Sequence, residues 1–216
     1  MRRGAVVAAT TTMSNQICWF VARASGIVAW ALLVASVVWG LFLAGRVARR
    51  FPPPSWTLDL HRFLGGLAVS FVAVHLVALV ADNYVYFSWS ELFVPLASRW
   101  RPWPVALGIV ASYLLVAIEI TSLLMRHLPR KLWRGVHLSS FGLAVLATVH
   151  GFTAGADAAH PAVRIGAVAA GALVVVMVVL RLTMPGVQAR RRAQRQQSRQ
   201  RQPRTAVEAA EAPSTV

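Results

Sequence analysis

The sequence has few charged residues and a single cysteine. Only 13% of its 216 residues are charged, whereas a soluble domain carries about 25%, so the composition excludes an ordinary globular enzyme. The lone cysteine, Cys18, excludes an internal disulfide framework and a cysteine-ligated metal or iron–sulfur centre. The length suits about one domain, with no room for a nucleotide-binding module beside a membrane bundle.

Acidic residues are scarcer than basic residues. Seven Asp and Glu stand against 22 Lys and Arg, which gives a formal net charge of +15. In a soluble protein this excess would favour a nucleic-acid partner. Here the basic residues lie between long apolar runs, and hydrophobic residues make up 57% of the chain. We therefore expect no nucleic-acid partner, and a membrane protein whose arginines mark the cytoplasmic side.

Long apolar runs dominate the sequence. About 20 apolar residues in a helix cross the hydrocarbon core, and five runs meet this requirement: 18–44, 59–81, 104–125, 134–153 and 163–184. The first run is too long for a signal peptide and lacks a convincing cleavage site, so we interpret it as a retained helix. We expect an all-α, polytopic bundle of about five transmembrane helices in the cell (plasma) membrane.

Composition divides the chain into three parts. An N-terminal segment covers 1–16, the transmembrane domain covers 17–184, and a basic tail covers 185–216. The tail is rich in Arg and Gln and lacks aromatic residues. This composition predicts a disordered tail.

Charge in the connecting loops predicts the orientation. Basic residues lie between spans one and two and between spans three and four: Arg46, Arg49, Arg50, Arg126, Arg130 and Lys131. By the positive-inside rule, the N-terminus lies outside and the C-terminal tail lies in the cytoplasm. The aromatic-rich segment 84–103 predicts a short interfacial helix on the outer surface, and an ordinary loop is the alternative.

Histidines inside two spans are the candidate chemistry. His61 and His75 are 14 residues apart in the second span. On an α-helix, 14 steps come within about 40° of whole turns, so these two side chains share one face. His137 and His150 are 13 residues apart in the fourth span.

The spacing of 13 requires a distortion. It leaves about 140° between His137 and His150 on an ideal helix. Bending or tightening around Ser139, Ser140 and Gly142 would bring the two side chains to one face. We therefore expect an irregularity at that point.

The two histidine-bearing spans are expected to run in the same direction. His61 and His137 then lie at the inner level, and His75 and His150 lie about 20 Å away at the outer level. Two facing pairs of neutral imidazoles suit the axial ligation of two haems in a helical bundle. Packing contacts between helices are the alternative role for these histidines, and so is metal binding in a non-haem membrane protein.

Arginines are expected to support the haems. Arg23 lies in the first span at the outer side, where we expect no carboxylate to compensate it, so it would pair with propionates of the outer haem. Arg62 and Arg134 would do the same at the inner level. The alternative for all three is anchoring at the membrane surface. Glu119 would pair with Arg62 or Arg134, gate a proton, or extend to the inner surface.

Together these features resemble the ferric reductase-like transmembrane family. That family includes the membrane portion of NADPH oxidases and the haem-binding membrane subunit of the bacterial methionine sulfoxide reductase system. The resemblance covers roughly 17–184. Besides the histidine spacings, it rests on these motifs: Trp19…Arg23-Ala-Ser-Gly26, His61-Arg62, Asp82, Thr121-Ser122, Trp133-Arg134-x-x-His137 and Gly151…Gly155-x-Asp157.

The resemblance implies one-electron transfer across the membrane through two stacked b-type haems. The sequence has no dinucleotide-binding glycine pattern, so it predicts an oxidoreductase component that lacks its own flavin and nicotinamide domain. Electrons would come from a cytoplasmic flavoprotein or membrane quinol, with a loosely bound flavin as an option. They would reach ferric iron, oxygen or an extracytoplasmic partner reductase. A quinol-oxidising cytochrome b subunit is an alternative in the same class.

Overall fold

The computed structural model describes residues 2–44, 54–82 and 87–180, and all regular structure in these residues is helical. Five of the described helices are long and apolar enough to cross a membrane: Gln16–Ala44, Trp56–Ala81, Pro102–Leu123, Arg130–Ala154 and Pro161–Leu180. The predicted all-α fold with five spans is therefore confirmed. The tail 185–216 and the arginines of the first loop lie outside the described residues, and the orientation stays a prediction.

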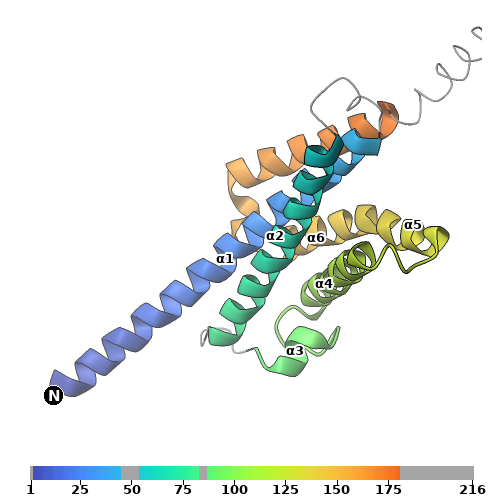
Figure 1. Cartoon of the computed structure of the whole chain (residues 1–216). Coiled ribbons are helices and arrows are strands. Elements are labelled where there is room, and N and C mark those ends of the chain that lie inside the picture. Colours follow the sequence, from blue (N-terminus) through green and yellow to red (C-terminus); the bar gives the residue numbers. More distant parts are fainter. Residues whose placement is uncertain (1, 45–53, 83–86, 181–216) are drawn as a thin grey trace, which may run out of the picture. The chain divides into compact units, whose positions relative to one another are not determined.

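Figure 1 shows the order of the elements along the chain. They are α1 (Arg2–Ala44), α2 (Pro54–Ala81), α3 (Trp89–Phe93), α4 (Pro102–Leu123), α5 (Arg130–Leu138), α6 (Ser140–Ala154) and the 3₁₀ helix η2 (Ala156–Ala159). Several starts follow from proline, whose fixed φ suits the first helical turn and whose missing N–H is not needed there. Pro102 begins α4 directly after Arg101, which has a φ of 44°.

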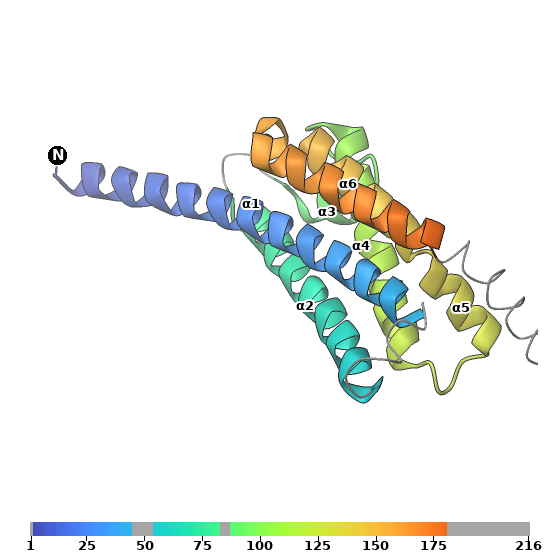
Figure 2. The ribbon, with the colours of Figure 1, turned by 90° about the horizontal axis from the view of Figure 1, so that it is seen from above.

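The chain divides into two compact units, Met1–Val174 and Val175–Val216. All candidate site residues belong to the first unit. Within it, α1 and α2 lie side by side (Figures 1 and 2), and α4 packs against α6. α1 also contacts α6, and α2 contacts α4. The four helices therefore share one interior.

Two small buried clusters lie among the described residues of the first unit. One joins α1, α4 and α6 through Leu33, Ala111, Leu115, Ile118 and Leu143. The other, made of Phe87, Leu92, Val105 and Ile109, holds α3 against α4. Many large apolar side chains remain exposed, as expected of helices whose outer faces meet lipid chains instead of water.

The fourth span is interrupted where the histidine spacing predicts it. α5 ends at Leu138 and α6 begins at Ser140. At the junction, the backbone N–H of Ser139 donates to the carbonyl of Val136 at 3.1 Å, and the Ser139 hydroxyl donates to the same carbonyl at 2.6 Å. This i to i−3 bonding tightens the turn locally.

The aromatic-rich segment contains a helix, although a shorter one than the segment. α3 starts at a capping box between Ser88 and Glu91, and hydrogen bonds from Ser88 hold the pKa of Glu91 below its usual value. Leu92 is buried, whereas the stacked rings of Trp89 and Phe93 are exposed. Such a helix, apolar on two faces, fits a membrane interface.

Candidate functional site: two histidine pairs

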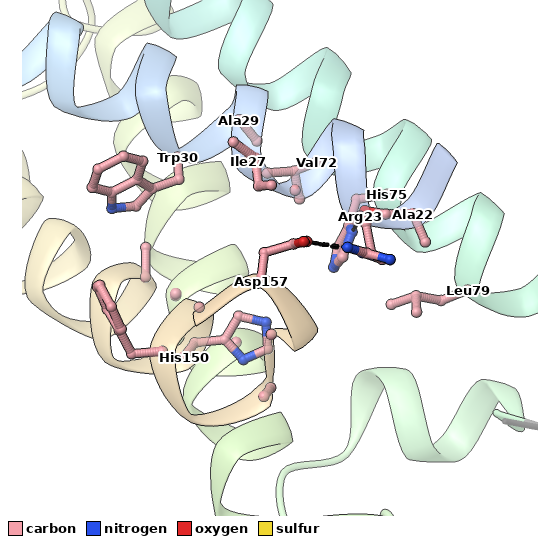
Figure 3. A pocket seen from close by; sticks show the side chains of 18 of the residues that line it. Ala22, Arg23, Ile27, Ala29, Trp30, Val72, His75, Leu79, His150 and Asp157 are labelled. Carbon is pink, nitrogen blue, oxygen red and sulfur yellow. Dashed lines mark hydrogen bonds and ion pairs between the residues drawn. The ribbon is translucent and has the colours of Figure 1, made fainter. Parts of the chain in front are cut away.

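His75 and His150 line one cavity. The cavity has a volume of about 470 Å³ and lies among α1, α2, α4, α6 and η2. Figure 3 shows the two histidines entering from different helices, with Trp30 and Val72 among the apolar side chains around them. Pockets for small molecules and cofactors are about 300–1,000 Å³ and mostly apolar. The cavity therefore has the size and lining of a cofactor site.

The hydrogen bonds of these histidines fix their tautomers. His75 Nδ1 lies 2.7 Å from the backbone carbonyl of Ala22. His150 Nδ1 lies 2.8 Å from the carbonyl of Pro104. A carbonyl only accepts, so Nδ1 must carry the proton in both rings. This leaves each Nε2 with a lone pair, which is the arrangement that metal-ligating histidines adopt.

His61 and His137 form the second pair. Their ring centroids are 5.9 Å apart with the planes at 77°. His61 Nδ1 lies 3.3 Å from the hydroxyl of Ser36. His137 stacks on Trp133 with centroids 5.2 Å apart, and its Nδ1 is buried with no hydrogen-bond partner among the described residues. The structure thus brings together both pairs that the sequence predicts.

Two glycines of α1 face the two histidines of α2. A Cβ on Gly26 would lie 3.1 Å from His75 Nδ1, and one on Gly40 would lie 3.1 Å from His61 Cε1. These glycines are 14 residues apart, like the histidines. Because the helices are antiparallel, the matched spacing repeats the same contact at both levels. Sequence reasoning missed this signal, although the shared spacing was readable.

A third glycine lies against the fourth span. A Cβ on Gly108 of α4 would lie 2.6 Å from His150 Cε1, closer than real side chains approach. Gly108 is four residues after Pro104, whose carbonyl accepts from the same ring. One turn of α4 therefore both bonds His150 and makes room for it.

Arg23 has a carboxylate partner, and the expectation that none lies at its level was wrong. Arg23 Nε donates to Asp157 Oδ2 at 2.8 Å, and Nη2 pairs with Oδ1 (Figure 3). Hydrogen bonds from this guanidinium lower the pKa of Asp157. Asp157 follows the fourth span in the sequence, and η2 brings it back to the cavity, which both residues line. The pair is bidentate, the strongest geometry for such contacts.

The other predicted charges, Arg62, Arg134 and Glu119, lie apart from the cavity that His75 and His150 line. Arg62 is exposed and pairs with Asp59 one turn away at 3.8 Å. Arg134 is exposed on α5. Glu119 points at Gly65 of α2, where its carboxylate would collide with any added Cβ. The expected pairing of Glu119 with Arg62 is not formed, since Arg62 reaches Asp59.

Residues 25–149 match the family described as Ferric reductase like transmembrane component. The match covers more than half of the chain, so the chain belongs to this family of membrane electron-transfer proteins. Domains of this family generally bind haem. The matched segment contains three of the four span histidines and ends one residue before His150. No curated protein and no solved structure matches the chain.

Proposed function

We propose that this chain carries electrons across a membrane with two b-type haems, each held between two histidines. His61 and His137 hold the inner haem, and His75 and His150 hold the outer one. The observation that carries the proposal is the pair of Nδ1 hydrogen bonds to the carbonyls of Ala22 and Pro104. Those bonds prepare Nε2 of both outer histidines for a metal.

The residues fit haem in three respects. The donors are neutral imidazoles in facing pairs, which is the ligand set of low-spin cytochromes. The cavity that His75 and His150 line is mostly apolar, as a porphyrin face requires. Glycine at 26 and 108 leaves room beside the rings. Bound haem iron would supply one-electron chemistry.

The chain's own residues then orient the ligands. The carbonyls of Ala22 and Pro104 hold the outer imidazoles in one tautomer. A carbonyl that accepts from Nδ1–H makes the imidazole a better donor to iron. The Arg23–Asp157 pair lies at the cavity and supplies a neutral pair of charges there. Arg23 remains a candidate for contact with a haem propionate, since it lines the cavity. Arg62 and Arg134 are proposed to lie near the inner propionates.

Direction and partners belong to the same proposal. The arginine distribution favours an outer N-terminus and a cytoplasmic tail, 185–216. Electrons would enter from a cytoplasmic flavoprotein or membrane quinol, with or without a loosely bound flavin, and leave to ferric iron, oxygen or a partner reductase outside. Protease added to intact cells should spare a C-terminal tag and remove it only after lysis. Cleavage in intact cells would reverse the direction.

Haem content tests the function itself. The purified chain should give a reduced-minus-oxidised spectrum of b-type haem, with two haems per chain. Absence of haem from protein that is correctly inserted would reject the proposal. Adding a quinol or a flavin reductase to membrane vesicles and following haem reduction would then identify the class of donor, which also distinguishes a quinol-oxidising cytochrome b subunit.

A further inference from the structure

Three of the four histidines share one kind of seat on the facing helix. Each seat consists of a hydrogen-bond partner for Nδ1 and, four residues later, a glycine that makes room for the ring. α1 provides two of them and α4 provides the third. The seats are Ala22 with Gly26 for His75, Ser36 with Gly40 for His61, and Pro104 with Gly108 for His150.

His137 is the histidine without a seat. Its Nδ1 is buried and has no partner among the described residues, which is costly for a ring nitrogen in an apolar bundle. The two seats on α1 are 14 residues apart, one for each level. Applying the same step to Pro104 and Gly108 of α4 gives Ile118 and Ser122, so a serine stands in the last turn of that helix where the repeat would have a glycine. α4 packs against α5, which bears His137.

Ser122, like His137, has a buried polar atom without a hydrogen-bond partner among the described residues. Its hydroxyl is buried without a hydrogen-bond partner in the part of the chain that the structure describes, and the only other such side-chain atom there is Trp133 Nε1. An iron-ligating His137 would present an Nδ1–H that needs an acceptor. The indole of Trp133 can only donate, whereas a serine hydroxyl can accept. Of the three unpaired groups, Ser122 is thus the one able to satisfy His137.

We propose that Ser122 is a positioning residue that accepts the Nδ1–H of His137, directly or across one buried water. The proposal rests on the proposed function, because it concerns His137 as an iron ligand. It makes the two levels chemically different. The outer histidines donate to backbone carbonyls, which can only accept, whereas the inner histidines share serine hydroxyls at 36 and 122, which can also rotate and donate. The hydrogen bonds of the inner histidines therefore polarise their imidazole rings less than those of the outer histidines do.

Redox titration of haem-loaded protein tests this role. In Ser122→Ala, His137 loses its acceptor and donates less to iron, so the midpoint potential of the inner haem should shift to a more positive value while the outer one stays unchanged. The inner component is identified as the one that disappears in His137→Ala. Ser122→Thr keeps the hydroxyl and should restore the wild-type potential.

The neighbouring hydroxyl provides the matched control. Thr121 already donates to the carbonyl of Ala117 within its own helix at 2.7 Å, so Thr121→Val should leave both potentials unchanged. Should Ser122→Ala fail to accumulate, Ser122→Cys retains the size with a weak acceptor and should give a smaller positive shift than alanine would. Wild-type potentials in the alanine or cysteine variant, with two haems bound, would overturn the role of Ser122. Absence of haem from the wild-type chain would instead reject the proposed function.

Discussion

Gly108 lies so close to His150 that a methyl group on it would be 2.6 Å from the imidazole Cε1. The contact is on α4, whose backbone also binds the ring through the Pro104 carbonyl. Adding a side chain would therefore push His150 away from its hydrogen bond and from its place in the cavity. Overpacking of this kind costs about 1–3 kcal/mol in a protein interior.

Gly108→Ala should lose the outer haem or bind it weakly. Gly142→Ala is the matched control, because a Cβ at Gly142 of α6 meets nothing within 4 Å and alanine favours a helix. Haem per chain and thermal stability, measured for both variants, check the prediction. Equal haem content in the two would show that the close approach of Gly108 is not needed.

The pairing of His61 with His137 predicts that replacing either histidine removes the same haem. Their ring centroids are 5.9 Å apart, so each should supply one ligand to the same iron. His61→Ala and His137→Ala should lose the same component in a potentiometric titration. If they lose different components, the assignment of pairs is wrong.

The four span histidines could be predicted from the sequence because a spacing of 14 is nearly a whole number of turns. The same periodicity located the interruption at Ser139, since 13 residues do not fit one face. Loop conformation has no such periodicity, so the return of η2 to Arg23 was missed. The hydrogen bonds to the carbonyls of Ala22 and Pro104 were missed as well. Every residue has a backbone carbonyl, so the residue type does not show which carbonyl accepts a hydrogen bond.

The Arg23–Asp157 pair predicts a stability difference that depends on pH. Arg23 lowers the pKa of Asp157. Because the folded pKa lies below the unfolded one, the stabilisation is complete above the unfolded value of about 3.9 and is lost as pH falls through the folded value. The side chains are 33% and 24% exposed, so the contribution is about 1 kcal/mol or less.

Thermal unfolding of wild type and Asp157→Asn measures this contribution. The two should differ by the same amount at pH 7 and pH 5 and converge in stronger acid, where the wild-type carboxylate is protonated. A difference that persists unchanged in strong acid would show that the variant acts by another route than loss of charge.

Opposite charges at the cavity should move the outer potential in opposite directions. Arg23→Gln removes a positive charge and leaves the carboxylate of Asp157, which favours the oxidised iron and lowers the potential. Asp157→Asn leaves the guanidinium and raises it. The double variant should return close to wild type, because the pair is neutral as a whole. Titration of all three variants decides whether the pair acts on the outer haem, since equal potentials would exclude it.

The central claim is that His75 holds one of two haems, and its replacement tests this most directly. Leucine cannot ligate iron and suits an apolar span, so His75→Leu should insert normally. Haem is then quantified per chain in purified wild type and variant, together with reduced-minus-oxidised spectra. The account predicts two haems in the wild type and one, the inner, in His75→Leu, with transfer across the membrane abolished. Two haems per chain in His75→Leu would contradict it.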